Sequence, residues 1–221
     1  MTAKVIIPVF HFTKILEKII AFYREHLDDA IIIIMNDGVE HTLDYLNNDN
    51  VIVIDNIIHN DLSWAFLYAD SNGITDSTDV IITNEHDVMP SAEALYAGLE
   101  VYLHMRHMMN VASVSFIYQW KGVNCYPTHE AWITKYDSLV DDSAYGTISI
   151  VGSQGVPFGC AIWNPDAFKH LSTEGLPTVK SLDSQFGALL YALGYTQLRM
   201  LNYTVEHYNG GVKSWRFKPV V

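Results

Sequence analysis

The chain has 221 residues and a net charge of −12, with 13 basic against 25 acidic side chains. Hydrophobic residues make up 49% of the chain and charged residues only 17%, a composition that excludes a disordered protein. Because so acidic a surface repels phosphate backbones, a nucleic-acid partner is also excluded. The cysteines, Cys125 and Cys160, have neither the spacing of a zinc site nor the number needed for a disulfide framework.

The sequence predicts a cytoplasmic protein with no stable membrane anchor. Its first apolar group is interrupted at Pro8, so no apolar core of a secretory leader is expected. The apolar run at residues 30–35 is much shorter than the roughly 18 residues that a membrane-spanning helix needs. This run is typical of a strand that is buried on both faces.

The first half of the chain alternates short apolar runs with helical patterns. Strands are expected at residues 4–10, 30–36, 51–54 and 80–83. Helices are expected from Thr13 to about His26, from Asp61 to Asn72–Gly73, and from Pro90–Ser91 to about Met109. This alternation predicts a single α/β, Rossmann-like domain whose mostly parallel central sheet is flanked by helices.

The second half has a less regular pattern. A strand is expected at residues 111–118, followed by a long, partly irregular segment at residues 120–157. A short strand at residues 161–163 then precedes a short helix that begins at Asn164–Pro165. The last expected elements are a helix at residues 182–193, stopped by Gly194, and a strand at residues 195–203.

Polar side chains follow the second and fourth expected strands. In an open α/β sheet, ligands bind beyond the carboxyl ends of the strands, so Asn36–Asp37 and Glu85–His86–Asp87 would share one edge. In an extended chain Glu85 and Asp87 would point to the same side and repel each other unless a cation lies near. The pattern predicts a site for Mg²⁺ or Mn²⁺, while a solvated acidic turn before the next helix remains the alternative.

The other candidates also have two interpretations each. Asn36 and Asp37 either support a strand-to-helix turn or accept hydrogen bonds from a nucleobase or ribose. Asp183 is either a first-turn acid that the helix dipole favours or a general base. His207 is either a structural histidine or a ligand beside a mobile glycine-containing loop at Gly210–Gly211.

The order of these clusters resembles the family-2-like glycosyltransferases of the GT-A fold. The resemblance covers roughly residues 4–208 and implies a nucleotide-sugar donor, with UDP-sugar as the expected one, and a divalent metal, Mn²⁺ or Mg²⁺. It also implies a nucleotide-sugar-binding half at about residues 1–110 and an acceptor-binding half with a C-terminal lid at about residues 111–221. The segments that carry it are VIIPVF, MNDG, VIITNEHDVMP, FGCAIWNPDAF, SLDSQFGALLYALGY and EHY.

The resemblance assigns a role to each candidate residue. Pro8 and Phe10 would line the nucleobase, with Asp37 as its acidic contact and Asn36 in place of a second acid. Glu85 would lie near the ribose and the metal. The metal ligands would be Asp87, Glu85 and His207, and the catalytic base of an inverting reaction would be Asp183. The family's basic contacts to the diphosphate have no obvious counterpart, and Lys213 and Arg216 in the tail are the candidates for them.

The chain departs from the family pattern at three positions. Glu85 stands where the family has Asp, Leu182 replaces the Glu that usually precedes Asp183, and Val39 replaces a Ser. The expected activity is transfer of a sugar to a glycan or other hydroxyl acceptor. The alternatives are a catalytically degenerate GT-A protein that binds carbohydrate or nucleotide, and a sugar nucleotidyltransferase. The latter usually has a glycine-rich basic loop after its first strand, which residues 10–14 lack.

Overall fold

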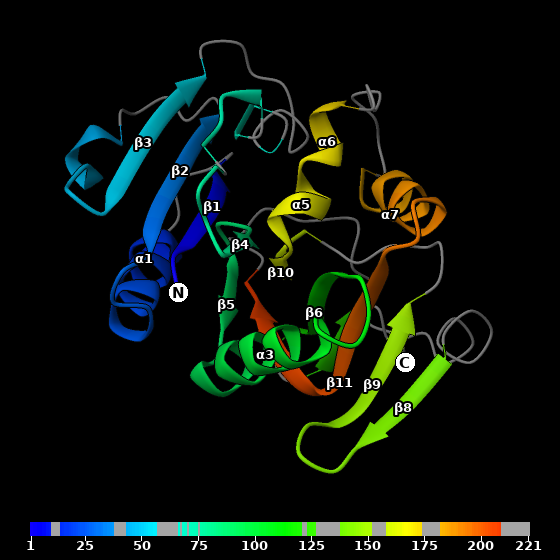
Figure 1. Cartoon of the computed structure of the whole chain (residues 1–221). Coiled ribbons are helices and arrows are strands. Elements are labelled where there is room, and N and C mark those ends of the chain that lie inside the picture. Colours follow the sequence, from blue (N-terminus) through cyan, green and yellow to red (C-terminus); the bar gives the residue numbers. More distant parts are fainter. Residues whose placement is uncertain are drawn as a thin grey trace.

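A computed structural model describes residues 1–9, 14–37, 43–56, 66, 68–69, 71–74, 76–120, 123–126, 138–151, 158–173 and 182–208. In these ranges the chain forms an α/β domain around an 11-stranded sheet (Figure 1). The strands are β1 (Ala3–Val9), β2 (Ile31–Asp37), β3 (Val51–Asn56), β4 (Val80–Asn84), β5 (Val88–Pro90), β6 (Val111–Trp120), β7 (Val123–Tyr126), β8 (Ser138–Asp142), β9 (Gly146–Val151), β10 (Cys160–Trp163) and β11 (Thr196–His207). The helices are α1 (Lys14–His26), α3 (Ala92–Met105), α5 (Pro165–Phe168), α6 (His170–Thr173) and α7 (Leu182–Ala192), with a 3₁₀ turn at Asp44–Leu46.

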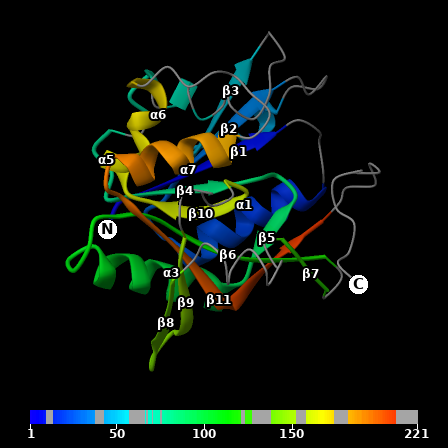
Figure 2. The same cartoon turned by 90° about the vertical axis from the view of Figure 1, so that its right-hand side faces the viewer.

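Helices cover both faces of the sheet (Figure 2). Along β1, Val5 and Ile7 belong to the core that includes Leu16 of α1 and residues of α3. Ile6, between them, belongs to a second core with Phe186 of α7 and residues of α5 and α6. Since successive side chains of a strand point to opposite faces, a strand covered on both sides is apolar at every position. This explains the uninterrupted apolar runs of β1, β2 and β4.

The helix starts expected at Pro90–Ser91 and Asn164–Pro165 agree with the local geometry. Ser91 caps α3, because its Oγ accepts a hydrogen bond from the backbone N–H of Ala94 at 3.1 Å. Asn164 caps α5 in the same way through Asp166 N at 2.9 Å. Most of the helix expected from Asp61 lies outside the described residues, but its expected end at Gly73 has a φ of 66°. Among the helices that the structure describes, none is long and apolar enough to cross a bilayer.

The sheet is mixed, so the expectation of a mostly parallel sheet is wrong for the second half. Its strand order is β3-β2-β1-β4-β10-β6-β11-β9-β8, with β5 paired to β11 and β7 to β6. The pairs β3–β2, β2–β1 and β1–β4 are parallel, as is the pair β6–β11. β10 lies between β4 and β6 and runs antiparallel to both, and the β5, β7, β8 and β9 pairings are antiparallel as well. Periodicity predicts where strands lie but not their direction.

The segment at residues 120–157, which was expected to be partly irregular, contains β7, β8 and β9 in its described parts. β8 and β9 form a hairpin that extends from the sheet. Its turn begins at Asp142, whose Oδ1 accepts hydrogen bonds from the backbone N–H groups of Ala144 and Tyr145. Gly146 closes the turn with a φ of 77°, a conformation that favours glycine.

Close packing of α3 on the sheet gives the first prediction. A Cβ atom at Gly98 would lie 2.6 Å from Phe116 Cζ and 2.7 Å from Ile162 Cδ1, closer than carbon atoms approach each other. Gly98→Val should therefore lower the free energy of unfolding, measured with urea, by about 1–3 kcal/mol. Glu93→Val on the exposed side of the same helix controls for β-branching and should cost less than about 1 kcal/mol. An equal loss of unfolding free energy in both variants would contradict close packing at Gly98.

Candidate functional site

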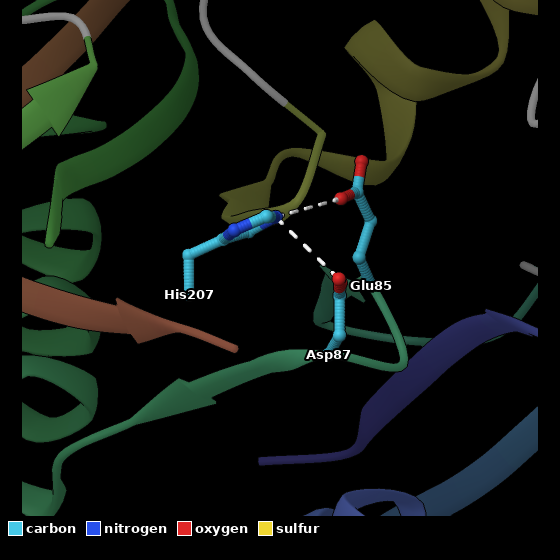
Figure 3. A group of neighbouring side chains, drawn as sticks. All are labelled: Glu85, Asp87 and His207. Carbon is cyan, nitrogen blue, oxygen red and sulfur yellow. Dashed lines mark ion pairs between the residues drawn. The ribbon is translucent and has the colours of Figure 1, made fainter. Parts of the chain in front are cut away.

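Three side chains from distant parts of the chain converge beyond the carboxyl end of β4 (Figure 3). Glu85 and Asp87 lie in the turn between β4 and β5, and His207 is the last residue of β11. His207 Nε2 is 3.6 Å from Asp87 Oδ2 and 4.0 Å from Glu85 Oε2. One ligand atom from each residue lies within 4.8 Å of the other two. The structure thus brings together the three residues that the sequence analysis assigned to a metal.

The backbone around the two acids is a turn, not the extended chain that the sequence analysis assumed. The N–H of Val88 donates to the carbonyl oxygen of Glu85 at 3.1 Å, which closes the turn. The N–H of Glu85 donates to the carbonyl oxygen of Gly159 at 2.7 Å, which ties the turn to the start of β10. This turn lets both carboxylates point toward His207 (Figure 3).

Strand pairing places His207 beside Asp87. β5 follows the turn directly and pairs antiparallel with the end of β11, with Val88 opposite His207. The N–H of Tyr208 donates to the carbonyl oxygen of Asp87 at 2.6 Å and extends this pairing into the turn. The position of the imidazole is therefore fixed by backbone hydrogen bonds on both sides of the histidine.

The donor set fits a divalent cation. The side chain of His207 is 7% exposed, that of Asp87 18% and that of Glu85 29%, so the carboxylates are partly open to solvent. Two carboxylates at this spacing repel each other, and a cation between them would offset that repulsion. Carboxylate oxygens suit Mg²⁺ and Mn²⁺, whereas an imidazole nitrogen is better suited to first-row transition metals. The mixed set of two carboxylates and one imidazole matches Mn²⁺ better than Mg²⁺.

Gly159 and Tyr118 form the wall beside Glu85. A Cβ atom at position 159 would lie 2.8 Å from the Tyr118 hydroxyl oxygen and 3.3 Å from Glu85 Cδ. The Tyr118 ring lies 6.4 Å from the His207 ring, and its hydroxyl oxygen accepts a hydrogen bond from Cys160 N. Tyr118 and Trp163 both lie in the core, 4% and 1% exposed.

The nucleobase candidates lie at the ends of β1 and β2. Pro8 is buried in β1 opposite Met35, and Asn36 is 5% exposed at the same edge of the sheet. Asn36 Nδ2 donates to Asp55 Oδ1 of β3 at 2.6 Å, a contact that the sequence analysis missed. The sequence contained a signal for this contact, because Asp55 also follows an apolar run of a strand. For Asp37 the structure describes the backbone at the end of β2 and no more, and Phe10 lies outside the described residues.

The structure describes little of the candidates for the catalytic base and the diphosphate contacts. The backbone of Asp183 is in the first turn of α7, as expected, but its side chain is not among the described atoms. Lys213, Arg216 and the Gly210–Gly211 segment lie outside the described residues. The roles assigned to these residues therefore remain predictions.

Comparison with known proteins establishes the fold. No protein-family model and no curated protein sequence matches the chain. The mannosyltransferase PcManGT from Pyrobaculum calidifontis, solved in complex with GDP-Man and Mn²⁺, superimposes with a TM-score of 0.65 and 13% identity over 93% of this chain. GalNAc-T7, solved with UDP, GalNAc and Mn²⁺, gives a TM-score of 0.67 and 14% identity over 93% of this chain. The chain has the GT-A fold.

The match covers 56% of the mannosyltransferase chain and 43% of the GalNAc-T7 chain. This chain therefore spans about half the length of these two structures. The expected GT-A fold is confirmed, whereas membership of family 2 stays a prediction, because no family model matches.

Burial of the cysteine next to the site gives the second prediction. Cys160 is 2% exposed, and burial raises the pKa of its thiol to about 12. Because alkylation requires the thiolate, a Cys125→Ser variant should resist iodoacetamide at pH 8 when folded and react fully in urea. Since the folded-state pKa is the higher one, this thiol stabilises the fold below pH about 9, and that contribution is lost as the pH rises toward 12. Alkylation of the folded variant at the rate of a free thiol would contradict the burial.

Proposed function

We propose that this protein is a metal-dependent glycosyltransferase that moves a sugar from a nucleotide-diphosphate sugar to an acceptor hydroxyl. The observation that carries the proposal is the convergence of Glu85, Asp87 and His207 beyond the carboxyl end of β4 in a GT-A fold. Two glycosyltransferases of the same fold, solved with Mn²⁺ and a nucleotide or nucleotide sugar, support it. The UDP-sugar donor and the family-2 type of reaction are part of the same proposal.

The three converging side chains would hold the metal ion. Asp87 and Glu85 supply carboxylate oxygens and His207 supplies Nε2, the nitrogen that already faces both acids. When bound, a divalent ion supplies positive charge for a diphosphate group whose negative charge grows as its bond to the sugar breaks. The ends of β1 and β2 would bind the nucleobase and ribose through Pro8, Phe10, Asn36 and Asp37, with Asn36 oriented by Asp55.

Asp183 would act as the general base. Its carboxylate would accept the proton of the acceptor hydroxyl while that oxygen bonds to the anomeric carbon and the bond to the diphosphate breaks on the opposite face. A base on the acceptor side leads to inversion at the anomeric carbon. Lys213, beyond the glycines at positions 210 and 211, would contact the diphosphate and help to exclude water, which otherwise competes with the acceptor.

The metal assignment predicts that nucleotide binding depends on Asp87. With Mn²⁺ present, UDP or GDP should raise the melting temperature of the wild-type protein, and EDTA should abolish the shift. Asp87→Asn keeps the shape but removes the charge, and it should weaken Mn²⁺ binding at least about tenfold and abolish the nucleotide-dependent shift. Asp49→Asn, at an exposed acid away from the site, is the matched control and should behave as wild type. An unchanged shift in Asp87→Asn would contradict the assignment.

The base assignment predicts a separate effect at Asp183. Asp183→Asn should lower kcat by a factor of about 10²–10⁴ while Mn²⁺ and nucleotide binding stay unchanged. Release of nucleoside diphosphate, followed over a panel of donor sugars and acceptors, measures kcat, and NMR of the product gives its anomeric configuration. Retained configuration, or loss of Mn²⁺ binding in this variant, contradicts the assigned role. Nucleotide binding without turnover by the wild type across the panel would indicate a binding protein in place of a transferase.

A further inference from the structure

Asn84 lies directly before the turn that carries the two acids, and its side chain spans that turn. It is the last residue of β4 and is fully buried. Its Nδ2 donates to the carbonyl oxygen of Glu85 at 2.7 Å and to that of Val88 at 2.8 Å. These carbonyls belong to the first and the last residue of the closed turn. One amide group therefore holds both ends of the segment from which Glu85 and Asp87 project.

The chemistry of the neighbours fixes the orientation of this amide. Backbone carbonyls only accept hydrogen bonds, so the NH₂ group of Asn84 must face them and its oxygen must face away. On that other side the Tyr23 hydroxyl donates to Asn84 Oδ1 at 2.8 Å. The amide thus uses both of its donor hydrogens and its acceptor oxygen, and an aspartate at position 84 would place an oxygen against two carbonyl oxygens.

Tyr23 is itself held rigidly. It lies on α1 and is fully buried in the core between this helix and the sheet. The Cys160 thiol lies next to its hydroxyl, and Cys160 pairs with Asn84 in the register of β4 and β10. Burial raises the pKa of both groups, so both stay neutral at physiological pH. A neutral hydrogen-bonded chain thus runs from α1 through Tyr23 and Asn84 to the acidic turn.

We propose that Asn84 is a positioning residue of the metal centre, which holds the turn so that the carboxylates of Glu85 and Asp87 face His207. Tyr23 anchors Asn84 and so contributes to the same role indirectly. Neither residue touches the metal or the donor. The inference rests on the proposed function, because it concerns the same metal site, and it adds two residues that the ligand set does not include.

Manganese affinity distinguishes positioning from a merely structural role. Mn²⁺ binding to the full chain is titrated by EPR for the wild type, Asn84→Ala and Tyr23→Phe. Loss of a residue that orients metal ligands typically weakens metal binding 10–100-fold, so Asn84→Ala should raise the Kd for Mn²⁺ about 10-fold or more. Tyr23→Phe removes the anchoring hydroxyl and leaves the amide in place, so its Kd should rise about 3-fold.

Thr83→Val is the matched control. Thr83 is buried in the same strand next to Asn84, and its Oγ1 accepts a hydrogen bond from Trp163 Nε1 at 2.9 Å, away from the turn. This variant also loses a buried hydrogen bond, so its melting temperature should fall. Its Kd for Mn²⁺ should stay within 2-fold of the wild-type value.

The outcomes separate the two proposals. A wild-type protein that does not bind Mn²⁺ overturns the proposed function and the positioning role with it. A wild type that binds Mn²⁺ and an Asn84→Ala variant of equal affinity overturn the positioning role alone, as does an equal loss of affinity in Thr83→Val. If Asn84→Ala does not fold, Tyr23→Phe decides, and a wild-type Kd in that variant overturns the role.

Discussion

The repulsion between two carboxylates on one tight turn is the constraint around which this site is built. Ligand atoms of Glu85, Asp87 and His207 lie within 4.8 Å of one another. Two like charges about 5 Å apart interact by about 3 kcal/mol at an effective dielectric constant of 20. Backbone and side-chain hydrogen bonds to the turn hold the acids together against this repulsion. A turn held in this way is preorganised for a cation, because the free-energy cost of bringing the two carboxylates together arises when the chain folds and not when the cation binds.

The mixed topology of the sheet supplies the parts that hold the turn. β10, antiparallel between β4 and β6, follows Gly159, whose carbonyl oxygen accepts the hydrogen bond from Glu85 N. β11 pairs with β6 along most of its length, with β9 along its first part and with β5 at its end, where His207 lies. Since β11 runs parallel to β4, its carboxyl end lies at the same edge of the sheet, and the antiparallel pairing with β5 brings His207 to the turn after β4.

The sequence predicts what depends on local patterns. Apolar runs located β1, β2, β3 and β4, and the rule that ligands bind at strand ends selected Glu85 and Asp87. The direction of β10 and the pairing of β5 with β11 depend on contacts between distant residues, which no periodicity encodes. Asn84 was missed for a different reason, since an asparagine at a strand end is typical of an ordinary turn. The structure distinguishes it from an ordinary turn residue, because the hydroxyl of Tyr23, distant in sequence on α1, donates a hydrogen bond to its side chain.

Acidic residues lie at the carboxyl ends of three of the four parallel strands β3, β2, β1 and β4. Asp37 ends β2, Asp55 lies at the end of β3, and the Glu85–Asp87 turn follows β4. Asp55 lies 2.6 Å from the amide of Asn36, so a carboxylate is present beside position 36 even though that residue is not an acid. Such an edge repels a diphosphate, and the net charge of −12 adds to the repulsion. The proposed donor would therefore require a cation at this edge, and its affinity would depend on the occupancy of the proposed metal site.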